Sequence, residues 1–337
     1  MNGGIDFLGY TNKFNVSKNT IAISEGGTCG YVRFMTSDFW SGGHNYSLQK
    51  ISNKVNNLYL YHILKSYEKD IMKLGVGSGL KNIQLKALKD FEILLPPLNE
   101  QIAIANILSD LDRYLYSLDA LILKKESVKK ALSFELLSQR KRLKGFNQAW
   151  QRVRLGDIGK PCMCKRVMKH QTTRYGEIPF YKIGTFGNTA DAFISKKLFL
   201  EYKTKYSFPK KGDILISASG TIGRAVIYDG KPAYFQDSNI VWIDNDETLV
   251  KNDFLFYAYS NVKWNTEHTT ILRLYNDNFR NTLIPLPPLN EQIAIANILS
   301  ALDNEITSLK NKKRQFENIK KALNHDLMSA KIRVLKK

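Results

Sequence analysis

The strongest constraint on this chain is an internal repeat. The 15 residues Leu95–Ser109 recur without change as Leu286–Ser300, 191 positions later. The same offset carries Lys129–Leu132 onto Lys320–Leu323, so the similarity extends over about 40 residues. A repeat of this length indicates that the fold contains one structural unit twice.

Each copy of the repeat predicts a long amphipathic helix. Pro-Pro followed by Asn-Glu-Gln is typical of a helix start, here near Asn99 and Asn290. Apolar residues then recur mostly at steps of three and four, which is typical of a coiled-coil seam. About 40 helical residues span roughly 60 Å, which favours two spacer helices packed on each other over two independent core helices. The seam residues are Leu108, Leu111, Leu115, Leu118, Ile122, Leu132 and Leu136, and Leu299, Leu302, Ile306, Leu309, Phe316, Leu323 and Leu327.

Short aromatic and β-branched runs precede each helix and predict a mainly sheet globule. Ile21–Gly30 resembles Ile214–Gly223, and Phe7–Phe14 resembles Phe199–Tyr206. We therefore predict an α+β fold in which two mixed α/β globules, mainly sheet, are separated by two long helices packed as an antiparallel coiled coil. The repeat is pseudo-twofold. The predicted regions are 1–95 (first globule), 96–144 (first helix), 151–286 (second globule) and 287–333 (second helix).

The two globules are unequal in sequence. Roughly 45 residues at the start of the second globule have no counterpart in the first. This unmatched stretch contains Lys160, Lys165, Arg166, Lys169 and Arg174, with no acidic residue between Lys160 and Arg174. We expect the first globule to be shortened at its N-terminal side.

Composition indicates a folded, basic protein. Lys and Arg number 50 against 31 Asp and Glu, a formal charge of +19, while 43% of residues are hydrophobic. The sequence shows neither an apolar run long enough for a membrane span nor a signal peptide, so we expect a cytoplasmic location. Three cysteines are too few for a disulfide framework.

The motifs and their order resemble the specificity subunit of type I restriction-modification systems. The repeated Pro96-Pro97-Leu98-Asn99-Glu100-Gln101 and Pro287-Pro288-Leu289-Asn290-Glu291-Gln292 carry this resemblance, with Gly212-Asp213-Ile214-Leu215-Ile216-Ser217 and the Gly220-Thr221-Ile222-Gly223 turn. In the first copy Asn19-Thr20 stands in place of Gly-Asp. The resemblance covers essentially the whole chain.

The resemblance implies a subunit without catalysis of its own. Its globules would be target-recognition domains that each read half of a bipartite site on double-stranded DNA, and its helices would be a ruler and a platform for two methyltransferase subunits. Restriction subunits would join this core. The chain itself would need no cofactor, since S-adenosylmethionine, ATP and Mg²⁺ would belong to the partner subunits. The shortened first domain also leaves open a truncated or phase-variation remnant that dimerises as a half-subunit.

Other functions that do not depend on this resemblance have less support in the sequence. A stand-alone Mg²⁺ nuclease would use Asp191, Glu201 and Lys203, but the first copy has no matching carboxylate. Zinc could be held by Cys162, Cys164 and His170, although Cys-x-Cys spacing suits a tetrahedral site poorly. A coiled-coil scaffold that binds no DNA is a further alternative, which the basic composition disfavours.

Candidate DNA contacts are basic and polar residues in loops. Phosphate contacts call for Lys and Arg, whereas base edges are read by Arg, Lys, Asn, Gln and Ser. The residues predicted to contact the phosphate backbone of DNA are Lys165, Arg166, Lys169 and Arg174. The predicted turn and base-edge contacts are Lys182, Ser219, Thr221, Arg224, Arg273 and Asn276 in the second globule and Ser78, Lys81 and Asn82 in the first.

Overall fold

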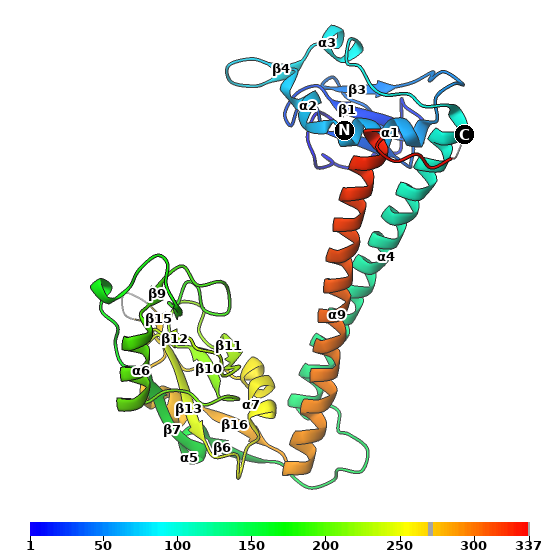
Figure 1. The fold of residues 1–337 in the computed structure, drawn as a ribbon. Coiled ribbons are helices and arrows are strands. Elements are labelled where there is room, and N and C mark those ends of the chain that lie inside the picture. Colours follow the sequence, from blue (N-terminus) through cyan, green and yellow to red (C-terminus); the bar gives the residue numbers. More distant parts are fainter. Residues whose placement is uncertain (269–271, 336–337) are drawn as a thin grey trace. The chain divides into compact units, whose positions relative to one another are not determined.

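The structure, a computed structural model, describes residues 1–268 and 272–335 and divides into two compact units. The first unit comprises Met1–Leu123 and Ser308–Lys337, and the second comprises Lys124–Thr307. Each unit therefore combines one globule with parts of both long helices (Figure 1).

The long helices are α4 (Leu98–Leu137) and α9 (Leu289–Met328), with 40 residues each. Both begin directly after the Pro-Pro pair, one residue before the predicted start. In each unit the α4 and α9 parts lie side by side (Figure 1). Seam residues such as Leu108 and Leu299 are completely buried. The predicted pair of long helices is confirmed. None of the helices in the described part of the chain is long and apolar enough to cross a membrane.

Ion pairs between the helices show that they run antiparallel. In the first unit, Lys320 of α9 pairs with Asp112 of α4, and Lys313 pairs with Asp119 at 2.6 Å. In the second unit, Lys125 pairs with Glu305 at 2.8 Å and Lys129 with Asp303. Within each unit, partner numbers on α9 fall as numbers on α4 rise, as the sequence predicted.

The first globule is built on a small antiparallel sheet of order β2-β1-β3. The central strand is buried at every position because Ile21 and Ile23 face the core on one side, while Ala22 packs with Val16, Met35 and Phe39 on the other. The elements are β1 (Thr20–Ser24), β2 (Val32–Met35), β3 (Asn45–Leu48), α1 (Asn57–Ser66), α2 (Glu68–Lys73), β4 (Gly75–Val76), β5 (Asn82–Ile83) and α3 (Leu85–Lys89).

The second globule repeats this plan and adds to it. Its main sheet has the order β11-β10-β13-β7, and a second sheet has the order β12-β8-β9. The added elements are β6 (Gln151–Arg154), α5 (Leu155–Ile158), β7 (Gly159–Met163), η1 (Lys169–Gln171), β8 (Ile178–Tyr181), β9 (Phe193–Ile194), α6 (Lys196–Lys205) and β12 (Tyr234–Phe235). The others are β10 (Ile214–Ser217), β11 (Ala225–Ile227), β13 (Ile240–Asn245), α7 (Asn252–Ala258), η2 (Tyr259–Asn261), β14 (Glu267–His268), β15 (Leu272–Arg273), α8 (Asn276–Asn281) and β16 (Leu283–Leu286).

One correspondence drawn from the sequence is wrong. Lys196–Lys205 forms helix α6, whereas the matching residues near Phe7 form neither helix nor strand. Phe199 is buried in the core formed by the second sheet, while Phe7 is half exposed and Tyr10 is 99% exposed. The helix forms where that additional core is present to cover its apolar face, and the first globule has no such core among the described residues.

Equivalent buried glutamines attach each globule to its long helix. Gln101 accepts a hydrogen bond from the Asn56 backbone N–H at 2.8 Å and donates to the carbonyls of Lys54 and Pro96. Gln292 accepts from the Lys251 N–H at 2.8 Å and donates to the carbonyls of Leu249 and Pro287. The repeated Glu-Gln motif is thus a structural attachment point.

Candidate nucleic-acid interface

The turn between β10 and β11 carries three of the predicted contact residues. Gly220 and Gly223 have left-handed φ values of +66° and +82°, which glycine adopts without strain. A Cβ at Gly223 would also lie 2.1 Å from the Trp264 indole nitrogen, so this glycine is required by packing. The turn leaves Thr221 and Arg224 exposed but buries Ser219.

The loop Gln236–Asn239, between β12 and β13, brings the predicted residues together. The Ser219 hydroxyl donates to Asn239 Oδ1 at 2.7 Å. Arg166 Nε donates to Asp237 at 2.8 Å. The backbone N–H of Ile183, next to Lys182, donates to Gln236 Oε1 at 2.9 Å. Residues 165–183 and 217–224 are therefore held against one loop.

The predicted contact residues differ in how strongly their side chains are held by other parts of the protein. Arg166 is held in its ion pair with Asp237, whose side chain is 16% exposed. Lys182 pairs with Asp191 at 2.8 Å, and Arg224 donates to the Phe186 carbonyl at 2.9 Å. These three side chains have positions fixed by the protein, which suits direct readout better than nonspecific attraction.

The basic segment after β7 supplies the exposed cations. Lys165 stacks its ammonium 5.1 Å from the centre of the Tyr206 ring. Lys169 and Arg174 are exposed, and within the described residues they form no ion pair. Lys165, Lys169 and Arg174 are therefore available for phosphate contacts.

Apart from Asn276, the remaining predicted residues lie on the β14–β15 hairpin of the second globule and the β4–β5 hairpin of the first. Arg273 in β15 forms a β-bridge with Ser219, which connects that hairpin to the turn after β10. In the first globule Asn82 in β5 lies against Gly26, and a Cβ on Gly26 would be 2.2 Å from Asn82 Oδ1. Asn276, at the start of α8, and Ser78 and Lys81, between β4 and β5, are exposed.

Sequence reasoning missed the loop residues Gln236, Asp237 and Asn239. The signal was present, because a run of polar residues, Gln-Asp-Ser-Asn, interrupts the apolar strands β12 and β13. Ser238 has a φ of +52°, an uncommon value for a non-glycine residue. Such strain is concentrated at functional sites, which makes this loop part of the candidate interface.

The groupings considered for metal chemistry are not brought together. Asp191 pairs with Lys182, and this hydrogen bond lowers the pKa of the Asp191 carboxyl; Glu201 instead pairs with Lys205 at 3.1 Å. Cys164 is buried, which raises the pKa of its thiol to about 12, while His170 is exposed. In the described part of the chain, no cluster of three or more His, Cys, Asp or Glu could hold a metal ion.

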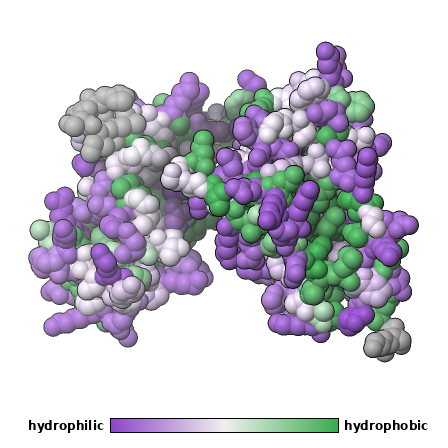
Figure 2. Space-filling model, turned by 90° about the horizontal axis from the view of Figure 1, so that it is seen from above, coloured by the Kyte–Doolittle hydropathy of each residue, from purple (hydrophilic) through white to green (hydrophobic). Residues whose placement is uncertain are grey.

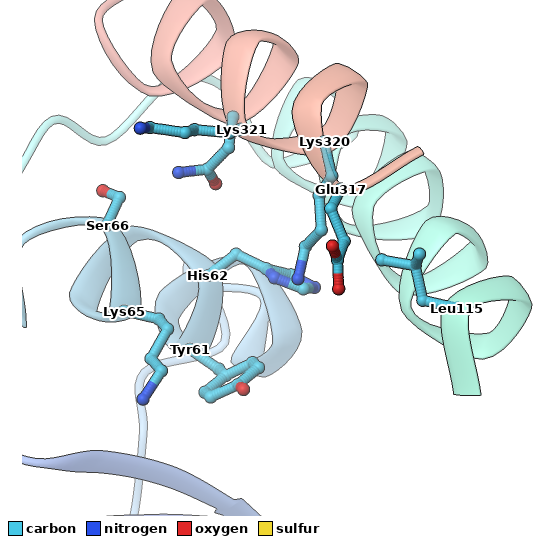
Figure 3. Close-up of a pocket in the computed structure, with 9 residues that line it drawn as sticks. Tyr61, His62, Lys65, Ser66, Leu115, Glu317, Lys320 and Lys321 are labelled. Carbon is cyan, nitrogen blue, oxygen red and sulfur yellow. The ribbon is translucent and has the colours of Figure 1, made fainter. Parts of the chain in front are cut away.

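A cavity of about 380 Å³ in the first unit lies where α1 packs against the long helices (Figure 3). His62 points from α1 towards Lys320 and Glu317 of α9 (Figure 3), and its Nε2 lies 3.1 Å from the Ser109 hydroxyl. Burial lowers the His62 pKa to about 4. Lys65 pairs with Glu68, and Lys320 pairs with Asp112. Two of the cations that line this cavity are therefore already paired within the fold.

Comparison with known proteins gives the family. A model of the type I restriction modification DNA specificity domain matches residues 1–125 and 147–318. A putative type I restriction enzyme specificity subunit of Haemophilus influenzae is 40% identical over 330 residues, covering 91% of this chain and 83% of that protein. A putative specificity subunit of Methanocaldococcus jannaschii is 31% identical over 310 residues, covering 85% and 71%.

The fold is also found in solved structures. The crystal structure of a type I restriction-modification S subunit from Mycoplasma genitalium matches with a TM-score of 0.71, covers 97% of this chain and 87% of that one, and is 24% identical. The repeated globule and helix plan, the family model and the relatives agree. This chain belongs to the family of type I restriction-modification specificity subunits.

Proposed function

We propose that this subunit carries out no catalysis and directs partner subunits to a DNA site, which it reads through the loops around Gln236–Asn239. The observation that carries this proposal is the convergence of three polar segments on that loop, with Lys165, Lys169 and Arg174 exposed in the same segment as Arg166. Fixed side chains such as Arg166 and Arg224 would read bases, and the exposed cations would bind phosphates.

A salt titration of DNA binding tests this proposal. Each phosphate contact that is removed lowers the slope of log K against log salt by about 0.9. The double variant Lys169→Ala, Arg174→Ala is expected to reduce the slope by about 1.8. The matched control Lys124→Ala, Lys130→Ala removes the same charge from exposed positions of α4. An equal loss of slope in both double variants would show that only net charge matters and would contradict the proposal.

The partners are proposed from the repeat. The long helices begin with the same sequence twice and expose the same apolar side chains there, Leu98 and Ile102 in α4 and Leu289 and Ile293 in α9, so a partner that binds one copy has an equivalent surface at the other. We infer two methyltransferase subunits on the helices, with restriction subunits joining this cytoplasmic complex. S-adenosylmethionine, ATP and Mg²⁺ would bind those partners.

Two measurements on the complex test the proposed stoichiometry. The mass of the complex with the cognate methyltransferase subunit is expected to correspond to two such subunits for each chain. Sequencing of methylated bases in a host that expresses only these two proteins is expected to show a bipartite, asymmetric site. A symmetric palindromic site would instead indicate two copies of the second globule, and therefore the half-subunit alternative.

A further inference from the structure

Glu100 and Glu291 occupy equivalent positions in the two units but have different surroundings. Both are buried, and each is held by the arginine that lies 42 residues after the other glutamate: Arg142 binds Glu291 at 3.1 and 2.6 Å, and Arg333 binds Glu100 at 2.6 and 2.5 Å. Glu291 also accepts a hydrogen bond from the indole N–H of Trp150 at 2.9 Å. Among the described residues, no aromatic donor takes this place at Glu100.

Trp150 directly precedes strand β6 of the second unit. The described part of the first unit has no counterpart of this strand. β6 follows Trp150 and pairs antiparallel with β16, where Ile284 is fully buried. The counterpart of β16 is the segment 92–95, which pairs with no strand in the described residues. Leu94 and Leu95 are 48% and 50% exposed there, whereas Leu286 is only partly exposed.

The same site in the first unit is an open groove of about 210 Å³. Without an indole beside it, Arg333 is 51% exposed, whereas Arg142, stacked 5.9 Å from the Trp150 ring centre, is 26% exposed. Figure 2 shows hydrophobic surface in green over the first unit. Exposed apolar surface with a buried polar group at its base is typical of a binding site. The groove is lined by Tyr59, Leu95, Glu100, Leu327, Met328 and Arg333.

We propose that this groove binds an extended polypeptide segment of another protein, which adds a strand along residues 92–95. The occupant is defined by the equivalent site in the second unit, where Trp150 and β6 are seated. Its indole N–H would donate to the Glu100 carboxylate, its ring would stack on Arg333, and the following residues would pair with 92–95 by β-augmentation. This inference concerns a protein partner and is independent of the DNA-reading proposal.

A labelled peptide of residues 148–155, Gln-Ala-Trp-Gln-Arg-Val-Arg-Leu, tests the proposal on the full chain. Fluorescence anisotropy is expected to show saturable binding. A peptide with Phe in place of its Trp keeps the ring but loses the N–H, and is expected to bind about tenfold more weakly. Glu100→Gln in the protein is expected to weaken binding by a similar factor. Glu291→Gln is the matched control and is expected to have no effect, because Trp150 already fills that site.

Folding of the variants does not limit the test, because the unmodified chain gives a second readout. Hydrogen exchange of the 92–95 amides is expected to slow when the peptide is added. Lack of binding, or an equal loss in Glu100→Gln and Glu291→Gln, would overturn the proposal. Dimerisation of the chain that is abolished by Trp150→Phe would also overturn it, since a second copy would then be the occupant.

Discussion

Lys320 of α9 pairs with Asp112 of α4 at the position where, 191 residues earlier in the repeat, Lys129 pairs with Asp303. Each lysine lies on one copy of the repeated helix and each aspartate on the other copy. Because both pairs join the same two positions, an antiparallel arrangement satisfies them together. A parallel arrangement would place each lysine beside a lysine-bearing turn of its neighbour. The duplication thus encodes the direction of the helix pair.

Reversal of one charge in this pair is expected to destabilise the first unit by about 1 kcal/mol, since partly exposed ion pairs contribute little and repulsion replaces attraction. The variant is Lys320→Glu, and the change is measured by urea unfolding. Adding Asp112→Lys restores an opposite pair and is expected to recover most of the loss. Full additivity of the two single changes would contradict direct pairing.

Arg142→Ala is expected to destabilise the second unit by about 3 to 5 kcal/mol, because it leaves the buried Glu291 carboxylate with only the Trp150 N–H as a partner. Arg333→Ala is the matched change in the first unit and is expected to have a smaller effect, since Arg333 is half exposed to water. Hydrogen exchange resolved by unit measures both. Equal effects would contradict the role assigned to burial.

Gln292→Leu is expected to destabilise the second unit by about 3 kcal/mol. It removes three hydrogen bonds and leaves the Lys251 N–H and two carbonyls without their partner. Gln101→Leu removes the equivalent contacts in the first unit and is expected to give a loss of similar size. Denaturant unfolding followed by the amide exchange of each unit measures both. A loss below about 1 kcal/mol would indicate that water replaces the amide.

The first unit is expected to lose stability in mild acid because of His62. Burial is the main cause of its low pKa of about 4, with Asp112 acting to raise the value and Lys320 to lower it. The unfolded chain binds a proton near pH 6.5, whereas the folded chain binds it near pH 4. Stability is therefore fully present above about pH 6.5 and falls by about 3 kcal/mol as the pH drops to 4.

The matched comparison for this pH dependence lies in the second unit. Tyr257 stands at the corresponding place on α7 and donates its hydroxyl to Asp303 at 2.8 Å. The second unit therefore lacks an imidazole there. His62→Gln is expected to flatten the pH profile of the first unit between pH 4 and 6.5 while the profile of the second unit is unchanged. An unchanged slope in the variant would assign the acid sensitivity to other groups.

The sequence by itself determined the repeat, the starts of the long helices to within about one residue, their antiparallel pairing and the α+β plan of the globules. These features follow from local periodicity and from side chains repeated at one fixed offset, so that each copy of the repeat gives an independent prediction of the same structural element. The family followed from the same residues. The Phe7–Phe14 match went wrong because similar short sequences fold differently when one has a core to cover its apolar face and the other has not.

Only the tertiary structure decided how the candidate interface is assembled. Arg166 contacts Asp237 across 71 positions and Ser219 contacts Asn239 across 20, and the polar sequence of the Gln236–Asn239 loop does not indicate which residues it contacts. It also distinguished Arg142 from Arg333. Their partners are the equivalent glutamates of the two repeats, but Arg142 is more buried because Trp150 lies beside it. Such contacts depend on how loops pack against a finished sheet, a property that chain periodicity does not contain.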